Sequence, residues 1–175
     1  SEFGQLYYFL NHPSERDVAV RTLDRVARTI RDLAEDRGIR TLFVHVPAPL
    51  SGNPLGYRDV RDELLARAGL TERDLEVTDE LADAWLARGA AAGLRVLDLR
   101  PVFARSEERL FWTDGHLDRE GNERVASRVA NAIEWLLRAD RAGSPPGEVL
   151  GQVEDRVDAC EPPDVRAAAQ DEEDG

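Results

Sequence analysis

An acid and an imidazole stand two residues apart in the segment LFWTDGHLD, as Asp114 and His116. Residues i and i+2 of a helix point to different sides, so these side chains can meet only in a non-helical backbone. There the carboxylate can bind the imidazole Nδ1 and leave Nε2 able to accept a proton. The pair therefore predicts a general base, His116, oriented by Asp114. The hydroxyl that this base would activate has to be found elsewhere.

The pair lies in a loop between a short apolar strand, 95–99, and a helix of about 119–138. Apolar residues recur along one face of that helix, and Asp118 is its expected N-cap. The positive end of the helix disfavours a protonated imidazole whereas Asp114 favours it, and the sequence leaves open which effect is larger. Ligands of open α/β sheets bind beyond the carboxyl ends of the strands, so we expect the loop on that edge.

The elements that position this loop alternate between helix and strand. We expect a helix at 17–36, capped by Ser14 with Asp17 and ended by Gly38. The short, almost continuous apolar run 41–47, TLFVHVP, is rich in β-branched residues and predicts a strand buried on both faces. A loop, a weak helix at 57–70 and a stronger helix from Thr78 to Gly93 follow. This order predicts an α/β fold with a parallel sheet and right-handed crossovers.

A parallel sheet needs other elements on both of its faces and on both of its edges. With only two predicted strands, the three helices could cover the faces, but at least one strand edge would lack a neighbour. One solution is that the opening QLYYFL, 5–10, forms another strand. The other is that the chain is the back part of a larger domain, and we favour this second interpretation.

The amino-acid composition argues against several classes of protein. The chain has 175 residues and a net charge of −12, without a basic stripe that would bind nucleic acid. No apolar run is long enough to span a bilayer, and the single Cys160 excludes an internal disulfide framework. Residues 142–175 are rich in Gly, Pro, Asp and Glu, which predicts a disordered acidic tail. Because we expect the true N-terminus to be absent, the compartment stays unassigned.

No cofactor or metal site is expected. His12, His45 and His116 lack the spacing of zinc ligands, and the segment around Asp118 does not match a calcium loop. His45 alternates within the first strand as a core histidine would. Asp98 is expected to be a structural hydrogen-bonding residue at a strand end or, alternatively, a support for the site.

The segments VHVP and GLRVLDLRPVFARSEERLFWTDGHLDREGNERVASRVANAI together resemble the C-terminal half of an SGNH (GDSL-type) hydrolase. The last block of that family is an Asp and a His shortly before the final helix, often followed by Asn or Asp and then Gly. Here the block corresponds to Asp114, His116, Asp118 and Gly121. The resemblance covers about residues 14–138.

The resemblance implies a serine esterase or O-acyltransferase with a three-layer αβα, flavodoxin-like parallel sheet. A Gly-Asp-Ser serine would be the nucleophile, and its N–H, a Gly and an Asn would form the oxyanion hole. These blocks do not precede residue 14, so residues 1–141 would be the C-terminal portion of the domain. Their two strands would be the fourth and fifth of five. The chain would then be inactive without its missing N-terminal part, with a small-molecule or polysaccharide ester as substrate.

The sequence leaves several alternatives open. Ser51, with Asn53 as oxyanion donor, would be a local nucleophile, but its surroundings do not form a nucleophile elbow. Ser106 and Ser127 fit that role less well. Trp112 is either a packing residue or part of an acyl or sugar pocket. The chain as a whole would alternatively be a non-catalytic α/β binding module, a degenerate SGNH relative that recognises carbohydrate or protein, or a regulatory fragment that acts through its acidic tail.

Overall fold

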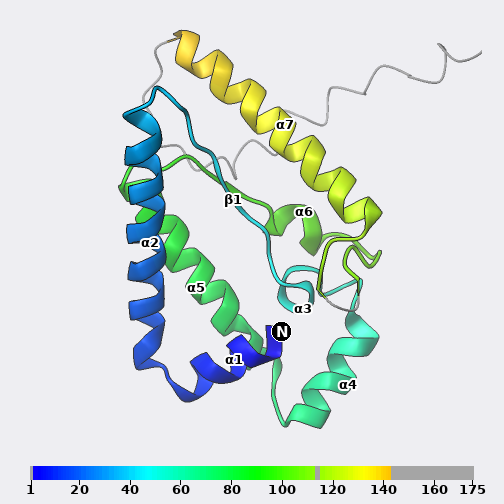
Figure 1. The fold of residues 1–175 in the computed structure, drawn as a ribbon. Helices are drawn as coiled ribbons and strands as arrows, with labels where there is room; N and C mark the ends of the chain where they lie inside the picture. The colour runs from blue at the N-terminus through cyan, green and yellow to red at the C-terminus, as the bar shows by residue number, and fades with distance from the viewer. Residues whose placement is uncertain (1, 113–114, 143–175) are drawn as a thin grey trace, which may run out of the picture.

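The computed structural model describes residues 2–112 and 115–142, which form an α/β arrangement dominated by helices. In chain order the elements are α1 (Glu2–Asn11), α2 (Ser14–Glu35), β1 (Phe43–His45), α3 (Pro49–Gly52), α4 (Arg58–Ala68), α5 (Glu72–Ala91), β2 (Val96–Asp98), α6 (Arg100–Ala104) and α7 (Arg119–Ala142). Figure 1 shows α2 and α5 side by side, with α7 on the other side of β1.

The two strands lie where the sequence predicts them, at the centre of the runs 41–47 and 95–99. They pair in parallel, with Phe43 opposite Val96 and His45 opposite Asp98. The Phe43 N–H donates to the Arg95 carbonyl at 2.9 Å, and the Leu99 N–H donates to the His45 carbonyl at 3.0 Å. A parallel pair needs a long crossover, which α3, α4 and α5 provide. The predicted α/β class with a parallel sheet is therefore confirmed.

Helices pack against both faces of this pair because successive strand residues point to opposite sides. Phe43 and Val96 contact a cluster that α2 and α5 supply. Val44 and Leu97 contact the cluster on the other face, to which α6 and α7 contribute. The first two residues of each strand are therefore apolar, because helices cover both faces there.

Helix α2 ends as predicted but begins differently. Gly38 has φ +67° and the Ile39 N–H donates to the Ala34 carbonyl at 2.9 Å, so the chain turns sharply after the helix. The predicted cap of Ser14 with Asp17 is wrong. Ser14 is the first helical residue and Pro13 precedes it, without a side-chain cap. Proline has the backbone angle that a helix start requires and offers no side-chain acceptor.

Three other expectations need correction. The opening segment is helical, as α1, and does not add a strand. Helix α5 begins at Glu72 instead of Thr78, because Thr71 and Asp74 form a reciprocal capping box. The loops predicted after both strands contain short helical turns, α3 and α6, each with a proline in its first turn.

Helix α7 begins at Arg119, as predicted, and extends to Ala142, four residues beyond its predicted end. The predicted acidic tail lies outside the described residues, except for Ala142. Cys160 lies outside them as well. Among the helices of the described ranges, none is long and apolar enough to cross a membrane.

Candidate active site

His116 is exposed on a short hairpin that connects β2 and α6 to α7. The two arms meet at Phe111 and Leu117, which form an antiparallel bridge. The Trp112 N–H donates to the His116 carbonyl at 2.7 Å, and the Asp118 N–H donates to the Leu110 carbonyl at 3.0 Å. The backbone at position 116 is thus non-helical, as the predicted acid–base pair requires. Asp114, the predicted orienting acid, lies outside the described residues.

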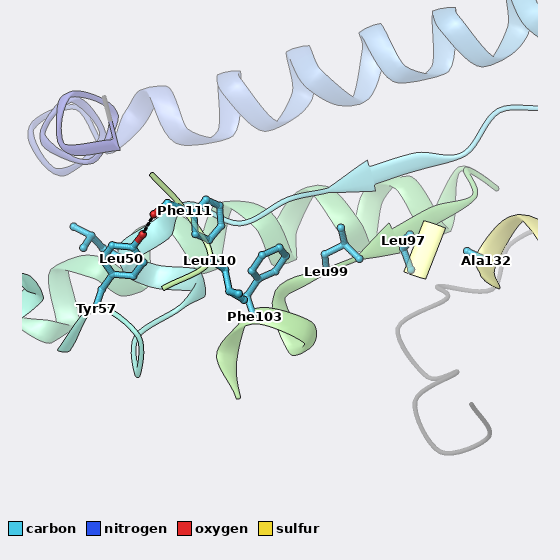
Figure 2. Close-up of a cluster of buried hydrophobic side chains, with 8 residues drawn as sticks. All are labelled: Leu50, Tyr57, Leu97, Leu99, Phe103, Leu110, Phe111 and Ala132. Atoms are coloured by element: carbon cyan, nitrogen blue, oxygen red, sulfur yellow. Dashed lines mark hydrogen bonds between the residues drawn. The ribbon is translucent and has the colours of Figure 1, made fainter. Parts of the chain in front are cut away.

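The base of the hairpin is anchored in the hydrophobic core. Leu110 is 0% exposed and Phe111 is 6% exposed, and both belong to the cluster that also contains Leu99 and Phe103. The Phe103 and Phe111 rings lie 5.1 Å apart. Figure 2 shows these side chains between Leu50 and Tyr57 at one end and Leu97 and Ala132 at the other. The hairpin therefore projects from a packed base.

Asn53 binds three backbone groups around this base. Its side-chain amide donates to the carbonyls of Phe103 at 3.1 Å and Ser106 at 2.8 Å, while its Oδ1 accepts the Leu110 N–H at 3.3 Å. Asn53 is completely buried. These contacts contradict the hypothesis of Asn53 as an oxyanion donor, because its N–H groups already satisfy buried carbonyls.

Tyr57 and Arg109 hold the hairpin from the α4 side. The Tyr57 hydroxyl donates to the Phe111 carbonyl (Figure 2), and burial raises the pKa of that hydroxyl. The Arg109 guanidinium lies 5.6 Å from the centre of the Tyr57 ring and forms two hydrogen bonds with the Asp59 carboxylate, at 2.7 and 2.8 Å. Hydrogen bonds from Arg109 lower the pKa of Asp59. These contacts join the first arm of the hairpin to the segment that follows β1.

The first turn of α7 explains the spacing between Asp118 and Gly121. Asp118 caps the helix as predicted, since its Oδ1 accepts the Gly121 N–H at 2.7 Å. A Cβ at Gly121 would lie 2.3 Å from the Leu110 carbonyl oxygen, so only glycine lets the helix approach the hairpin this closely. The two residues fix the angle at which α7 leaves the site.

The hairpin lies on the side of the sheet where both strands end. Its buried residues contact Leu50 and Tyr57, which follow β1, and Leu99 and Phe103, which follow β2. This is the carboxyl edge, where ligands of α/β sheets bind.

The serines near this edge do not have the surroundings of a nucleophile. Ser51 belongs to α3 and lines a hollow of about 400 Å³ together with Asp98 and Arg100, but His116 does not line it. Ser106 is 6% exposed, and its hydroxyl bonds to the backbone of Glu108. A buried serine turned toward its own loop cannot meet a substrate. Ser127 lies in α7, as expected.

Asp98 forms a structural ion pair at the end of β2, as one of the two interpretations predicts. The carboxylate accepts from the Arg100 N–H and from its guanidinium, at 2.8 to 3.2 Å, while Arg100 also binds Asp83 of α5 at 2.6 Å. Burial lowers the pKa of Arg100, but the hydrogen bonds to Asp98 and Asp83 outweigh it and raise the pKa.

His45 faces the same side of the sheet as Asp98. Its ring is half-buried and lies 6.4 Å from the Trp85 ring. Burial lowers its pKa below the usual 6.5, and the charge of Asp98 opposes this shift. The prediction of a core histidine holds only in part, because His45 lies in the strand as expected but is half-buried. No three His, Cys, Asp or Glu side chains of the described part form a group that would hold a metal ion.

Sequence reasoning missed the supporting role of Asn53, Gly56 and Tyr57. A Cβ at Gly56 would lie 2.4 Å from the Glu108 carbonyl oxygen, so this glycine also permits a close approach of two loops. The segment NPLGY has the composition of a turn, and that composition contains no sign of the partner. Only its contact with residues 103–111 shows the role.

One comparison with known proteins gave a match. The family model described as "SGNH hydrolase-like domain, acetyltransferase AlgX" matches residues 6–154. No curated protein and no solved structure matches the chain. The matched range includes the hairpin and all of α7, as well as both strands.

Proposed function

The chain belongs to the SGNH hydrolase-like family of the acetyltransferase AlgX, and we propose that it is the base-bearing part of an O-acyltransferase or esterase. In this proposal His116 is the general base and Asp114 orients it. The observation that supports the proposal most directly is the exposed His116 on a hairpin anchored at the carboxyl edge of the sheet. Such a position makes the imidazole accessible to a substrate and rigid at its base.

The proposed reaction is acyl transfer through a seryl ester. His116 Nε2 accepts the proton of a serine hydroxyl as its oxygen attacks the acyl carbon of an ester donor. The tetrahedral intermediate then collapses, and the imidazolium returns the proton to the leaving alcohol. In the second half, His116 deprotonates an acceptor hydroxyl or water, whose oxygen attacks the seryl ester. The imidazolium then returns the proton to the serine oxygen as the new ester or acid leaves. Asp114 would stabilise the imidazolium in both halves.

The serine of this reaction would belong to a further segment of the domain. The 175 residues contain no Gly-Asp-Ser block, and Ser51 and Ser106 lack the required surroundings. We therefore expect the chain by itself to be inactive toward esters. The missing N-terminal part of the domain is its proposed partner.

The surface of the described part supports a larger, three-layer αβα domain with a flavodoxin-like sheet. Phe43 and His45 use their backbone groups to pair with β2, so Val44 directs its N–H and C=O toward the opposite edge of β1. Beside that edge, α2 exposes an apolar stripe with roughly half of each side chain accessible: Leu23, Val26, Ile30 and Leu33. A strand added to β1 would pair with its edge and pack beneath the stripe.

A protein that contains this chain together with the nucleophile block tests the catalytic role. His116→Ala should lower kcat for an aryl acetate by about a thousandfold or more, and Asp114→Asn by a comparable or smaller factor. His12→Ala is the matched control, because His12 is an exposed histidine at the end of α1 and should leave kcat unchanged. Normal turnover by His116→Ala would refute the assignment.

The alternative is a non-catalytic binding module of the same fold. The lack of a Gly-Asp-Ser block within the 175 residues favours it. The sequence of the whole gene distinguishes the two, because an enzyme requires that block and a degenerate relative does not.

A further inference from the structure

Arginine side chains gather around a hollow at the amino edge of the sheet, where both strands begin. The hollow has a volume of about 320 Å³ and lies at the opposite edge from the hairpin. Its lining comes from the end of α2, from the segment before β1 and from the segment before β2, and includes Arg31, Glu35, Arg40, Thr41, Gly93 and Arg95. The hollow thus has three arginines and one acidic residue, in a chain whose net charge is −12.

Arg31 forms a fixed wall of this hollow. Its guanidinium donates to the Ala92 carbonyl at 2.6 Å and to the Asp32 carboxylate at 2.7 and 2.9 Å. Two glycines with positive φ turn the chain here, Gly38 at +67° and Gly93 at +72°. Nothing lies within 4 Å of a Cβ built on either glycine, so the rim of the hollow stays open.

The segment of opposite charge is DEED, residues 171–174. It lies outside the described residues, and also beyond residue 154, where the match to the family model ends. The thirty-three residues after Ala142 contain ten acidic residues and two arginines, so they carry a net charge of −8 out of the −12 of the chain. Carboxylates spaced along one segment suit guanidinium groups spaced around a hollow, because such pairs form strong, often bidentate hydrogen bonds.

The course of α7 brings this segment to the edge of the sheet where the hollow lies. The helix begins after the hairpin at the carboxyl edge, and in Figure 1 it runs antiparallel to β1. Leu42, which precedes β1, and Leu136, near the end of α7, pack against the same hydrophobic cluster. The twenty-eight residues between Ala142 and Asp171 are more than long enough to reach the hollow from the end of the helix.

We propose that the hollow is a docking site for the acidic segment 171–174 of the same chain. Its carboxylates bind Arg40 and Arg95, since a guanidinium has five N–H donors and can hold more than one acid. A dissolved inorganic anion binds at its solution concentration, whereas linkage in one chain supplies the segment at about a millimolar. The docked segment closes the amino edge and leaves His116 exposed, so the inference does not depend on the proposed catalytic role.

A nitroxide label near the end of the chain tests the contact by NMR of the 175-residue protein. Cys160 is the only cysteine, so Cys160→Ala combined with Gly175→Cys gives a single labelling position beside the acidic segment. The label should broaden the amide signals of Gly38 and Gly93 severalfold more than that of Gly115, which belongs to the hairpin at the other edge. The difference should disappear in about 1 M salt, where the Debye length is only about 3 Å.

Matched variants identify the charges that make the contact. Arg40→Gln with Arg95→Gln should abolish the selective broadening, whereas Arg119→Gln should preserve it, because Arg119 is an exposed arginine at the carboxyl edge. A second variant neutralises the segment, changes no described residue and should abolish the broadening as well: Asp171→Asn, Glu172→Gln, Glu173→Gln and Asp174→Asn.

Three results would overturn the inference. The first is equal broadening at both edges, or none, in the parent chain. The second is selective broadening that survives neutralisation of the acidic segment or high salt, because the contact would then not be one of charge. The third is selective broadening in unlabelled, isotope-enriched chains mixed with labelled ones, because the segment would then dock on a second copy and not on its own chain.

Discussion

The base of the hairpin and the outer face of α2 are both rich in apolar residues, but only the first is buried. At the hairpin base, Asn53 and Leu110 are 0% exposed. On α2, Leu23 is 50% and Leu33 is 52% exposed. The first region is closed by described residues from both strands, the loops after them and α7, whereas the described residues leave about half of each stripe residue on α2 uncovered.

The difference shows which parts of the domain this chain can order by itself. The loop with the proposed base is held by hydrogen bonds and close backbone approaches within the chain. The α2 stripe can only be buried by additional structure. Contiguous apolar surface that is exposed in this way marks an interface. The chain therefore has a self-sufficient site region and an incomplete sheet.

The largest effect is expected at the hairpin base. Asn53→Ala removes the partners of two buried carbonyls and one buried N–H, so it should lower the free energy of unfolding by about 3 to 5 kcal/mol. Asn122→Ala is the control, because its amide also binds two carbonyls but is exposed, and it should cost less than about 1 kcal/mol. Urea titration of the 175-residue chain measures both. If Asn53→Ala and Asn122→Ala lowered the free energy of unfolding by the same amount, the contacts of Asn53 would not be buried as described.

A pair of helical glycines tests the close packing. Gly121→Ala places a methyl group against the Leu110 carbonyl oxygen and should cost about 1 to 3 kcal/mol. Gly89→Ala, inside α5, meets Val96 and Leu94 side chains at 3.4 and 3.5 Å and should be neutral or stabilising by up to about 1 kcal/mol. Thermal unfolding of both variants gives the comparison. If Gly121→Ala is as stable as the parent, α7 does not need to approach the hairpin so closely.

The smallest effect is expected on the stripe. In the 175-residue chain, Leu23→Ala should change the free energy of unfolding by no more than about 0.5 kcal/mol, while Val20→Ala, on the buried side of α2, should cost about 2 kcal/mol. In a protein that includes further strands beside β1, Leu23→Ala should become as costly as Val20→Ala. A stripe substitution that stays neutral in that longer protein would contradict the proposed interface.

Local patterns sufficed for several parts of the fold. Helical periodicity identified α2 and α7, the apolar runs identified both strands, and Asp118 was recognised as a cap. Patterns failed where two signals competed. The periodicity after Thr78 obscured the earlier capping box at Thr71, and the apolar run QLYYFL fitted a strand as well as the helix that it forms.

What the sequence by itself determined is the chemistry of the proposed site: an acid and a histidine two residues apart, in a loop that leads from a strand into a capped helix. These features involve residues that are close together in the sequence, so the residue types and their spacing are enough to predict them. Only the tertiary structure decided what holds that loop and what surrounds His116. Asn53 is fifty or more residues from the backbone groups of Phe103, Ser106 and Leu110 that it binds, and the pairing of Trp112 with His116 depends on how the hairpin closes. Contacts of this kind arise from packing, and a residue's type does not specify its distant partner.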